Sequence, residues 1–172
     1  DRFGNANSAY SFNGFDRIYT TTDAEFNNLK KISISLWYKM NSHKNYNHFI
    51  NQKDKYALAE NINNGKIYFY YDESNFLQTG YESPLNVWNH LLVIYEFKQG
   101  STDESICKIY HNNSIIGSFT TTKDLATTTS NLIIGNYTET PSGENRFDGI
   151  IDDIMIWDRA LEADEVKYLY DN

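Results

Sequence analysis

Cysteine and proline are scarce in this 172-residue chain, and each scarcity excludes a class of structure. The single cysteine, Cys107, cannot form an internal disulfide, so packing or a bound metal has to hold the fold together. Cys107 alternates with Ile106 and Lys108 in a strand-like run, which predicts a buried and unreactive thiol. With two prolines and no long Gly/Ser stretch, no linker is visible, and we expect residues 1–172 to form a single domain.

Positive charge and long apolar runs are also lacking. The formal net charge is −8, and binding along a phosphate backbone needs a basic face, so we expect no nucleic-acid partner. No run approaches the ~20 apolar residues of a membrane span, and we expect no direct membrane insertion. The chain starts at Asp1 without a signal-peptide pattern, which we interpret as a mature or excised piece of a larger multidomain chain.

Strand-forming patterns are abundant. From Lys31 to Met40 apolar even positions alternate with mostly polar odd ones, and Trp37 lies on the polar side. Leu91 to Ile94 are apolar at every position, which predicts a strand covered on both faces. Asn64-Gly65 and Asn112-Asn113 predict tight turns. Further strands are expected near residues 49–51, 56–60, 66–71, 105–111, 115–120 and 132–135.

The last 26 residues place two adjacent carboxylates, Asp152 and Asp153, inside an apolar strand. Regular alternation would put them on opposite faces, and because both faces are otherwise apolar we expect both to be covered. An unpaired buried carboxylate costs several kcal/mol, so at least one should have a cation, backbone N–H donors or a metal beside it. Asp164 and Glu165 then favour the first turn of a short helix of two to three turns.

Four landmarks in order connect the chain with a known family. The pattern F-x-G-x-I-D-D-x-x-I-W-x-R-A-L at residues 147–161 resembles the closing motif of laminin G-like (concanavalin A-like) jelly-roll domains. The F-N-G at residues 12–14, the strand from Ile32 to Lys39 and Trp88-Asn89-His90 are similar to other landmarks of that family. The resemblance implies an all-β fold, an antiparallel two-sheet jelly-roll sandwich with one short C-terminal helix. It also implies a secreted or cell-surface protein.

A structural Ca²⁺ ion is a further implication of the resemblance. Ca²⁺ takes six to eight oxygen ligands, and the candidates are Asp16, Asp152 and Asp153, with Glu139, Glu144 and Asp148 in the loop before the closing strand. First and last strands of a jelly roll tend to lie side by side, so Asp16 could meet one of the paired aspartates. The alternative is an ion pair of Asp152 with Arg159, Arg146 or Arg17, and nothing in the sequence separates the two.

Catalytic motifs are missing. Relatives that hydrolyse glycans carry an E-x-D-x-x-E-like cluster, because retaining hydrolysis needs two carboxyls roughly 5 Å apart, and no such triplet occurs. Asp152 and Asp153 are consecutive, so in a regular strand they cannot flank one bond. The histidines show no H-E-x-x-H spacing, and G-x-S-x-G and Gly-rich phosphate loops are absent. We therefore predict that the protein is not an enzyme.

The positive signals favour ligand binding. Aromatics make up 16% of the chain, and Tyr, with 14 residues, offers a flat apolar face with a hydroxyl at its edge, which suits a sugar ring. Tyr68 and Tyr70 share the face opposite Ile67 and Phe69, and we take them, with Trp37, as candidate ligand-binding residues. The alternative for each is packing under a neighbouring loop.

These observations together predict a non-catalytic carbohydrate-recognition or adhesion module whose partner is a glycan or glycoprotein. The first alternative is a structural or protein-binding spacer of a multidomain extracellular protein. A glycan-active enzyme with scattered carboxylates is the second. Exposed aromatics gathered on one face would favour the binding module. A smooth charged face would favour the spacer, and a cleft with two close carboxyls would favour the enzyme.

Overall fold

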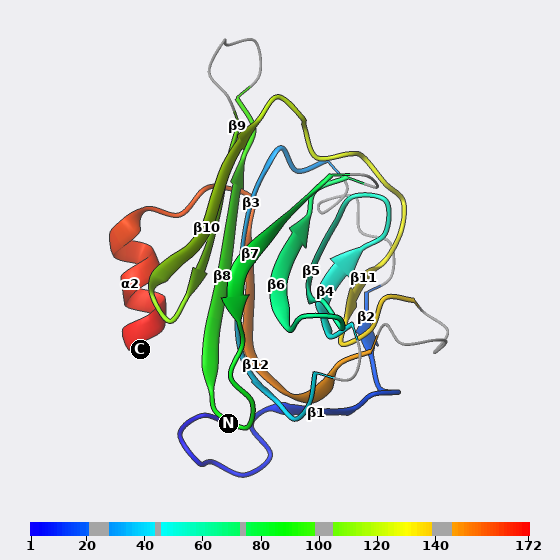
Figure 1. Ribbon diagram of the computed structural model, residues 1–172, viewed down its shortest axis with the longest axis vertical. Helices are drawn as coiled ribbons and strands as arrows, with labels where there is room; N and C mark the ends of the chain where they lie inside the picture. The colour runs from blue at the N-terminus through cyan, green and yellow to red at the C-terminus, as the bar shows by residue number, and fades with distance from the viewer. Residues whose placement is uncertain (21–27, 44–45, 73–74, 99–104, 139–145) are drawn as a thin grey trace.

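The computed structural model describes residues 1–20, 28–43, 46–72, 75–98, 105–138 and 146–172. They form two antiparallel six-stranded sheets packed face to face, with one helix on the outside (Figure 1). Sheet A has the order β1 (Tyr10–Asn13), β12 (Asp148–Trp157), β3 (Lys31–Met40), β8 (Asn89–Glu96), β9 (Ser105–His111), β10 (Ser114–Thr121). Sheet B has the order β2 (Ile18–Tyr19), β11 (Leu132–Ile134), β4 (His48–Gln52), β5 (Tyr56–Glu60), β6 (Lys66–Tyr70), β7 (Phe76–Glu82). The predicted all-β jelly-roll sandwich is confirmed.

The core lies between the two sheets and follows the predicted alternation. In β3 the apolar even positions, such as Ile34 and Leu36, are fully buried against inward side chains of sheet B, such as Leu58 and Phe69. Cys107 belongs to the same core, which confirms its predicted burial, and burial raises the pKa of its thiol. Because each strand gives one face to this core, its other face is left for a second function.

Local turn chemistry sets the hairpins. Gly65 has φ +64° in the β5–β6 connection, and Asn112 and Asn113 have φ +46° and +63° between β9 and β10. Glycine and asparagine tolerate this left-handed region better than other residues, so both predicted turns are confirmed. The bounds of β3, β5 and β9 match the sequence predictions. Strand β7 was not predicted, because its sequence F-L-Q-T-G-Y-E lacks a clear apolar alternation.

The C-terminal helix α2 (Ala163–Asp171) covers the outer face of sheet A (Figure 1). Its Val166, with Leu161 just before it, packs against Leu92 and Tyr110 of that face. This contact explains why the Leu91 to Ile94 stretch is apolar on both sides. In the described part of the chain, no helix has the length and apolar character needed to cross a membrane.

The closing strand departs from regular alternation at the paired aspartates. The pairing of β12 with β3 shifts between Asp152 and Met155, and Asp153 has φ +46°. This β-bulge leaves Asp152 buried and Asp153 exposed, and Met155 is 38% exposed. The expectation that both faces of this strand are covered was therefore wrong for Asp153 and Met155.

Candidate functional site

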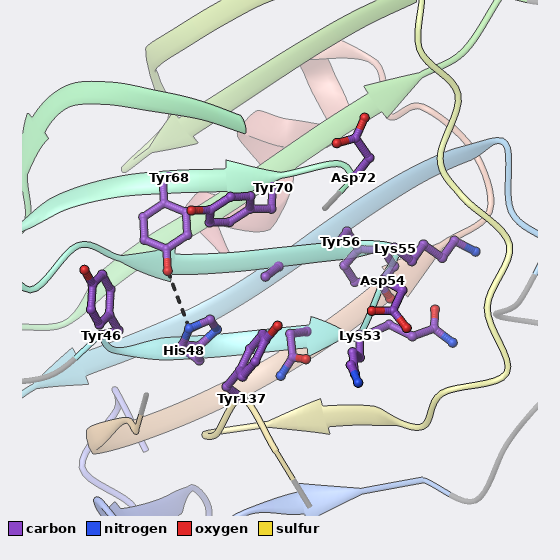
Figure 2. A pocket seen from close by; sticks show the side chains of 13 residues that line it. Tyr46, His48, Lys53, Asp54, Lys55, Tyr56, Tyr68, Tyr70, Asp72 and Tyr137 are labelled. Carbon is purple, nitrogen blue, oxygen red and sulfur yellow. Dashed lines mark hydrogen bonds between the residues drawn. The ribbon is translucent and has the colours of Figure 1, made fainter. Parts of the chain in front are cut away.

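A pocket of about 520 Å³ opens on the outer face of sheet B, the face that α2 does not cover. Figure 2 shows Tyr68 and Tyr70 of β6 on one side of it, and His48 of β4 with Tyr137 on the other. Pockets for small ligands are usually ~300–1,000 Å³. The hollow is therefore large enough for a sugar-sized ligand.

The hollow exists because small side chains on β5 lie between large ones on its neighbours. Ala57 pairs with Asn51 of β4 on one side and with Tyr70 of β6 on the other. The next outward position of β5 is Ala59, between His48 and Tyr68. Directly opposed residues of antiparallel strands point to the same face, so the alanines form a low strip between two walls.

The walls are built from rings in mutual contact. The centroid of the His48 ring lies 5.0 Å from that of Tyr137 and 6.3 Å from that of Tyr68. Tyr68 meets Tyr70 edge to face at 4.9 Å. Tyr68 is almost fully buried, whereas Tyr70 is half-buried and presents part of its ring to the pocket. These contacts fix the rings in place before any ligand arrives.

Two buried polar atoms beside the pocket lack a hydrogen-bond partner among the described residues. Asn51 donates from Nδ2 to the carbonyl of Asn136 at 2.5 Å, but its Oδ1 accepts nothing there. The Tyr68 hydroxyl lies 3.5 Å from Nε2 of His48 (Figure 2), whose Nδ1 has no partner in the same ranges. Buried polar groups are normally satisfied, so these atoms offer hydrogen-bonding capacity beside an apolar surface.

The two ends of the pocket differ in charge. Burial lowers the pKa of His48 to about 3 and raises the pKa of Tyr68, so the aromatic end is uncharged at neutral pH. The other end is lined by Lys53, Asp54, Lys55 and Asp72 (Figure 2). An uncharged ring-lined end next to charged groups suits a ligand that has apolar faces and a polar rim.

Of the three predicted ligand-binding residues, Tyr68 and Tyr70 lie in this pocket and Trp37 does not. Trp37 faces outward from sheet A, where its ring stacks on Tyr170 of α2 at 5.8 Å and 12°. The Arg2 guanidinium lies 4.5 Å from the centroid of the Trp37 ring. The Trp37 ring is thus engaged by both ends of the described chain, on the opposite sheet from the pocket.

The predicted metal-ligand residues are not brought together. Register pairs Asn13 of β1 with Asp148 and Tyr10 with Ile151, so Asp16 follows the end of β1 that lies away from the paired aspartates. Asp16 instead accepts the Asn13 backbone N–H at 3.1 Å. Within the described ranges no three His, Cys, Asp or Glu side chains gather where they could hold a metal. Glu139 and Glu144 lie outside the described residues.

The paired aspartates have partners of their own. Asp153 forms an ion pair with Arg2, and Asp152 accepts the backbone N–H of Asp153 at 2.9 Å. The arginine partners expected for Asp152 were Arg159, Arg146 or Arg17. In the described part of the chain Asp152 forms no ion pair with them, and Arg159 pairs with Glu165. A cation and an N–H donor are therefore present at this motif, and Ca²⁺ binding stays a prediction.

Sequence reasoning missed most of the pocket. His48, Asn51 and Ala57 carry no motif, and Tyr137 follows a short strand, so only the sheet register brings them beside Tyr68 and Tyr70. One signal was available: the outward positions of the predicted strand at 56–60 are both alanine, between two strands rich in large residues.

Comparison with known proteins fits this architecture. A family model described as the concanavalin A-like lectin/glucanases superfamily matches residues 12–167. None of the curated proteins matches the chain. Among solved structures, the CBM40 domain of a Ruminococcus gnavus sialidase bound to α2,3-sialyllactose is similar, with 14% identity, TM-score 0.76, and 95% of this chain and 97% of that chain covered.

Two further solved structures share the fold. Domain 4 of an extracellular arabinanase from Geobacillus stearothermophilus, in complex with arabinotriose, has 17% identity and TM-score 0.62, with 93% of this chain and 86% of that chain covered. A heptameric SAP-like pentraxin from Limulus polyphemus has 18% identity and TM-score 0.66, with 93% and 80% covered. The TM-scores establish a shared fold, and at these identities the likeness shows the fold alone.

Proposed function

We propose that this chain, which belongs to the concanavalin A-like lectin/glucanases superfamily, is a non-catalytic carbohydrate-binding module of a secreted or cell-surface protein. The observation that carries the proposal is the pocket on sheet B, with its ring walls, its alanine floor and its polar atoms that have no partner among the described residues. Sugars combine apolar C–H faces with hydroxyl groups, and this pocket offers partners for both. Two similar structures hold oligosaccharides, which supports the same assignment.

The position of the pocket favours binding over the two alternatives. A spacer domain needs no hollow lined by fixed rings, and the pocket face is not smooth. For an enzyme, the two carboxylates at the pocket would be Asp54 and Asp72. Asp72 accepts hydrogen bonds from the backbone N–H and the side-chain amide of Asn75, at 2.7 and 2.6 Å. Such a carboxylate is held in a structural role, which supports the non-catalytic assignment.

A glycan array probed with the wild type and pocket variants tests the proposal. Ala57→Phe fills the floor of the pocket and should remove binding, and Tyr70→Ala should weaken it about tenfold or more, because a stacking surface is lost. Ala57→Ser keeps the hollow, and Tyr10→Ala removes a tyrosine that is 62% exposed on sheet A, so both should bind like the wild type.

Three outcomes would contradict the proposal. The first is a wild type that binds no glycan on the array, which would favour the spacer. The second is wild-type binding that survives Ala57→Phe, which would put the site elsewhere. The third is cleavage of a bound glycan on prolonged incubation, detected as released sugar and lost in Asp72→Asn, which would make the protein an enzyme.

A further inference from the structure

The ring series of the pocket continues past the pocket wall to the edge of sheet B. Phe76 of β7 pairs with Tyr70 in register, and its ring centroid lies 5.0 Å from that of Tyr70 and 6.5 Å from that of Tyr68. The next residue, Leu77, packs into the core, so Phe76 points to the outer face. Tyr137, His48, Tyr68, Tyr70 and Phe76 thus form one series of neighbouring rings that crosses the strands.

Among the described rings of this series, Phe76 at the β7 end is the most exposed. On the β11 side the residue that pairs with Asn51 is Ile133, which is 3% exposed. On the β7 side Phe76 is 49% exposed, although it is a large apolar residue on an edge strand. Phe76 is in ring contact with Tyr70 and Tyr68, so its exposed part is continuous with the aromatic wall of the pocket and is available to a ligand.

The length of the row exceeds that of one sugar. Neighbouring strands are ~4.8 Å apart, so the three gaps between β4 and β7 span roughly 14 Å. One sugar ring can occupy the hollow over Ala57, but it cannot also cover Phe76. A molecule that uses the whole row must have at least two linked rings.

We propose that the site takes a linear oligosaccharide that runs across the strands, with one sugar in the pocket between His48 and Tyr70 and the next sugar on Phe76. This inference rests on the proposed carbohydrate-binding function and adds the size and direction of the ligand. The first sugar combines ring contact with hydrogen bonding, because polar atoms surround the hollow. The second is held by the flat apolar face of Phe76.

An array that carries each sugar as mono-, di-, tri- and tetrasaccharide tests the inference. For the wild type, signal should rise about tenfold from mono- to disaccharide, as expected for one additional aromatic stacking contact, and change little beyond. Phe76→Ala should remove this rise and leave monosaccharide binding as it was. Phe76→Leu keeps an apolar contact on Tyr70 but has no flat ring, and should show the same loss.

The controls separate this inference from the proposed function. Phe15→Ala removes a phenylalanine that is 61% exposed beyond β1 and should keep the full length dependence. Equal wild-type binding of mono- and oligosaccharides would overturn the inference and leave the proposed function intact. So would an equal loss for all lengths in both Phe76 variants, since Phe76 would then act only by supporting Tyr70. A wild type that binds no member of the array would overturn both.

Discussion

The two outer faces of the sandwich carry similar aromatic residues, but one face is covered and the other carries an open pocket. On sheet A, Trp37 is contacted by Tyr170 from α2 and by Arg2 from the N-terminal segment. On sheet B, the ring contacts of Tyr70 with described residues are to Tyr68 and Phe76 of the same face, and Tyr70 lines an open pocket. Both residues occupy outward positions of amphipathic strands, so the strand pattern does not distinguish them. What distinguishes them is that α2 and the N-terminal segment cover Trp37, and these segments come from the two ends of the described chain.

The largest expected difference between the two faces is in how much each aromatic side chain contributes to stability. Trp37→Ala should lower the free energy of unfolding by about 3 kcal/mol, because truncating a packed Trp loses transfer and cavity terms. Tyr70→Ala should cost under about 1 kcal/mol, since its ring lines an open pocket and α2 lies on the other sheet. Urea denaturation of both variants measures the difference. Equal losses would show that the two faces are equally structural, and lost glycan binding in folded Trp37→Ala would place a ligand on sheet A.

Acid should lower the free energy of unfolding by protonating His90, which lies on the covered face of sheet A. Burial, followed by the charge of Arg2, lowers the pKa of His90 to about 4, below its unfolded value of roughly 6.5. The unfolded chain therefore binds the proton first, and stability that is complete above pH 6.5 falls as the pH drops toward 4. At pH 4.5 the loss from this residue is on the order of 2–3 kcal/mol.

The measurement is the free energy of unfolding at pH 7.5 and 4.5 for the wild type and His90→Gln. The variant should lose less stability between the two values. Glu60 acts in the opposite direction, because burial raises its pKa to about 7 and the folded state then holds its proton more tightly. Because Glu60 is present in both proteins, its contribution cancels when the wild type and His90→Gln are compared. An equal change in the free energy of unfolding with pH for the two proteins would contradict the prediction.

The smallest effect concerns the paired aspartates. Asp153 pairs with Arg2 and is largely exposed, so Asp153→Asn should cost about 0.5–1 kcal/mol. The cost should be the same in millimolar calcium and in chelator, because the lost partner is a guanidinium. A cost that appears only in calcium would identify Asp153 as a metal ligand. Calcium binding through Asp16 or Asp152 stays a separate prediction. Melting curves of the wild type in calcium and in chelator check it.

The sequence predicted what depends on short-range periodicity. Alternation located β3, β5 and β9, and the asparagine and glycine residues located the hairpin turns. Alternation also put Tyr68 and Tyr70 on one face. It failed at Asp153, where a bulge resets the pattern, and at β7, whose edge position requires little apolar surface.

The rest of the site depends on contacts between distant residues. His48, Tyr70 and Phe76 come together through the register of four successive strands, and register is set by turns and core packing as a whole. Arg2 reaches Asp153 across 151 positions of sequence, so no local window contains that pair. The stacking of Tyr170 on Trp37 likewise joins residues far apart in the sequence, so the strand pattern alone could not predict it.

The contacts of Arg2 and Tyr170 with the Trp37 ring bring both ends of the described chain to one side of the molecule. Both ends of the described chain leave from sheet A, on the far side of the sandwich from the pocket. A tether or a neighbouring domain attached at either end would therefore join the molecule on the side away from the pocket. Attachment of isolated copies to a support through either end would keep the attachment point off the pocket face.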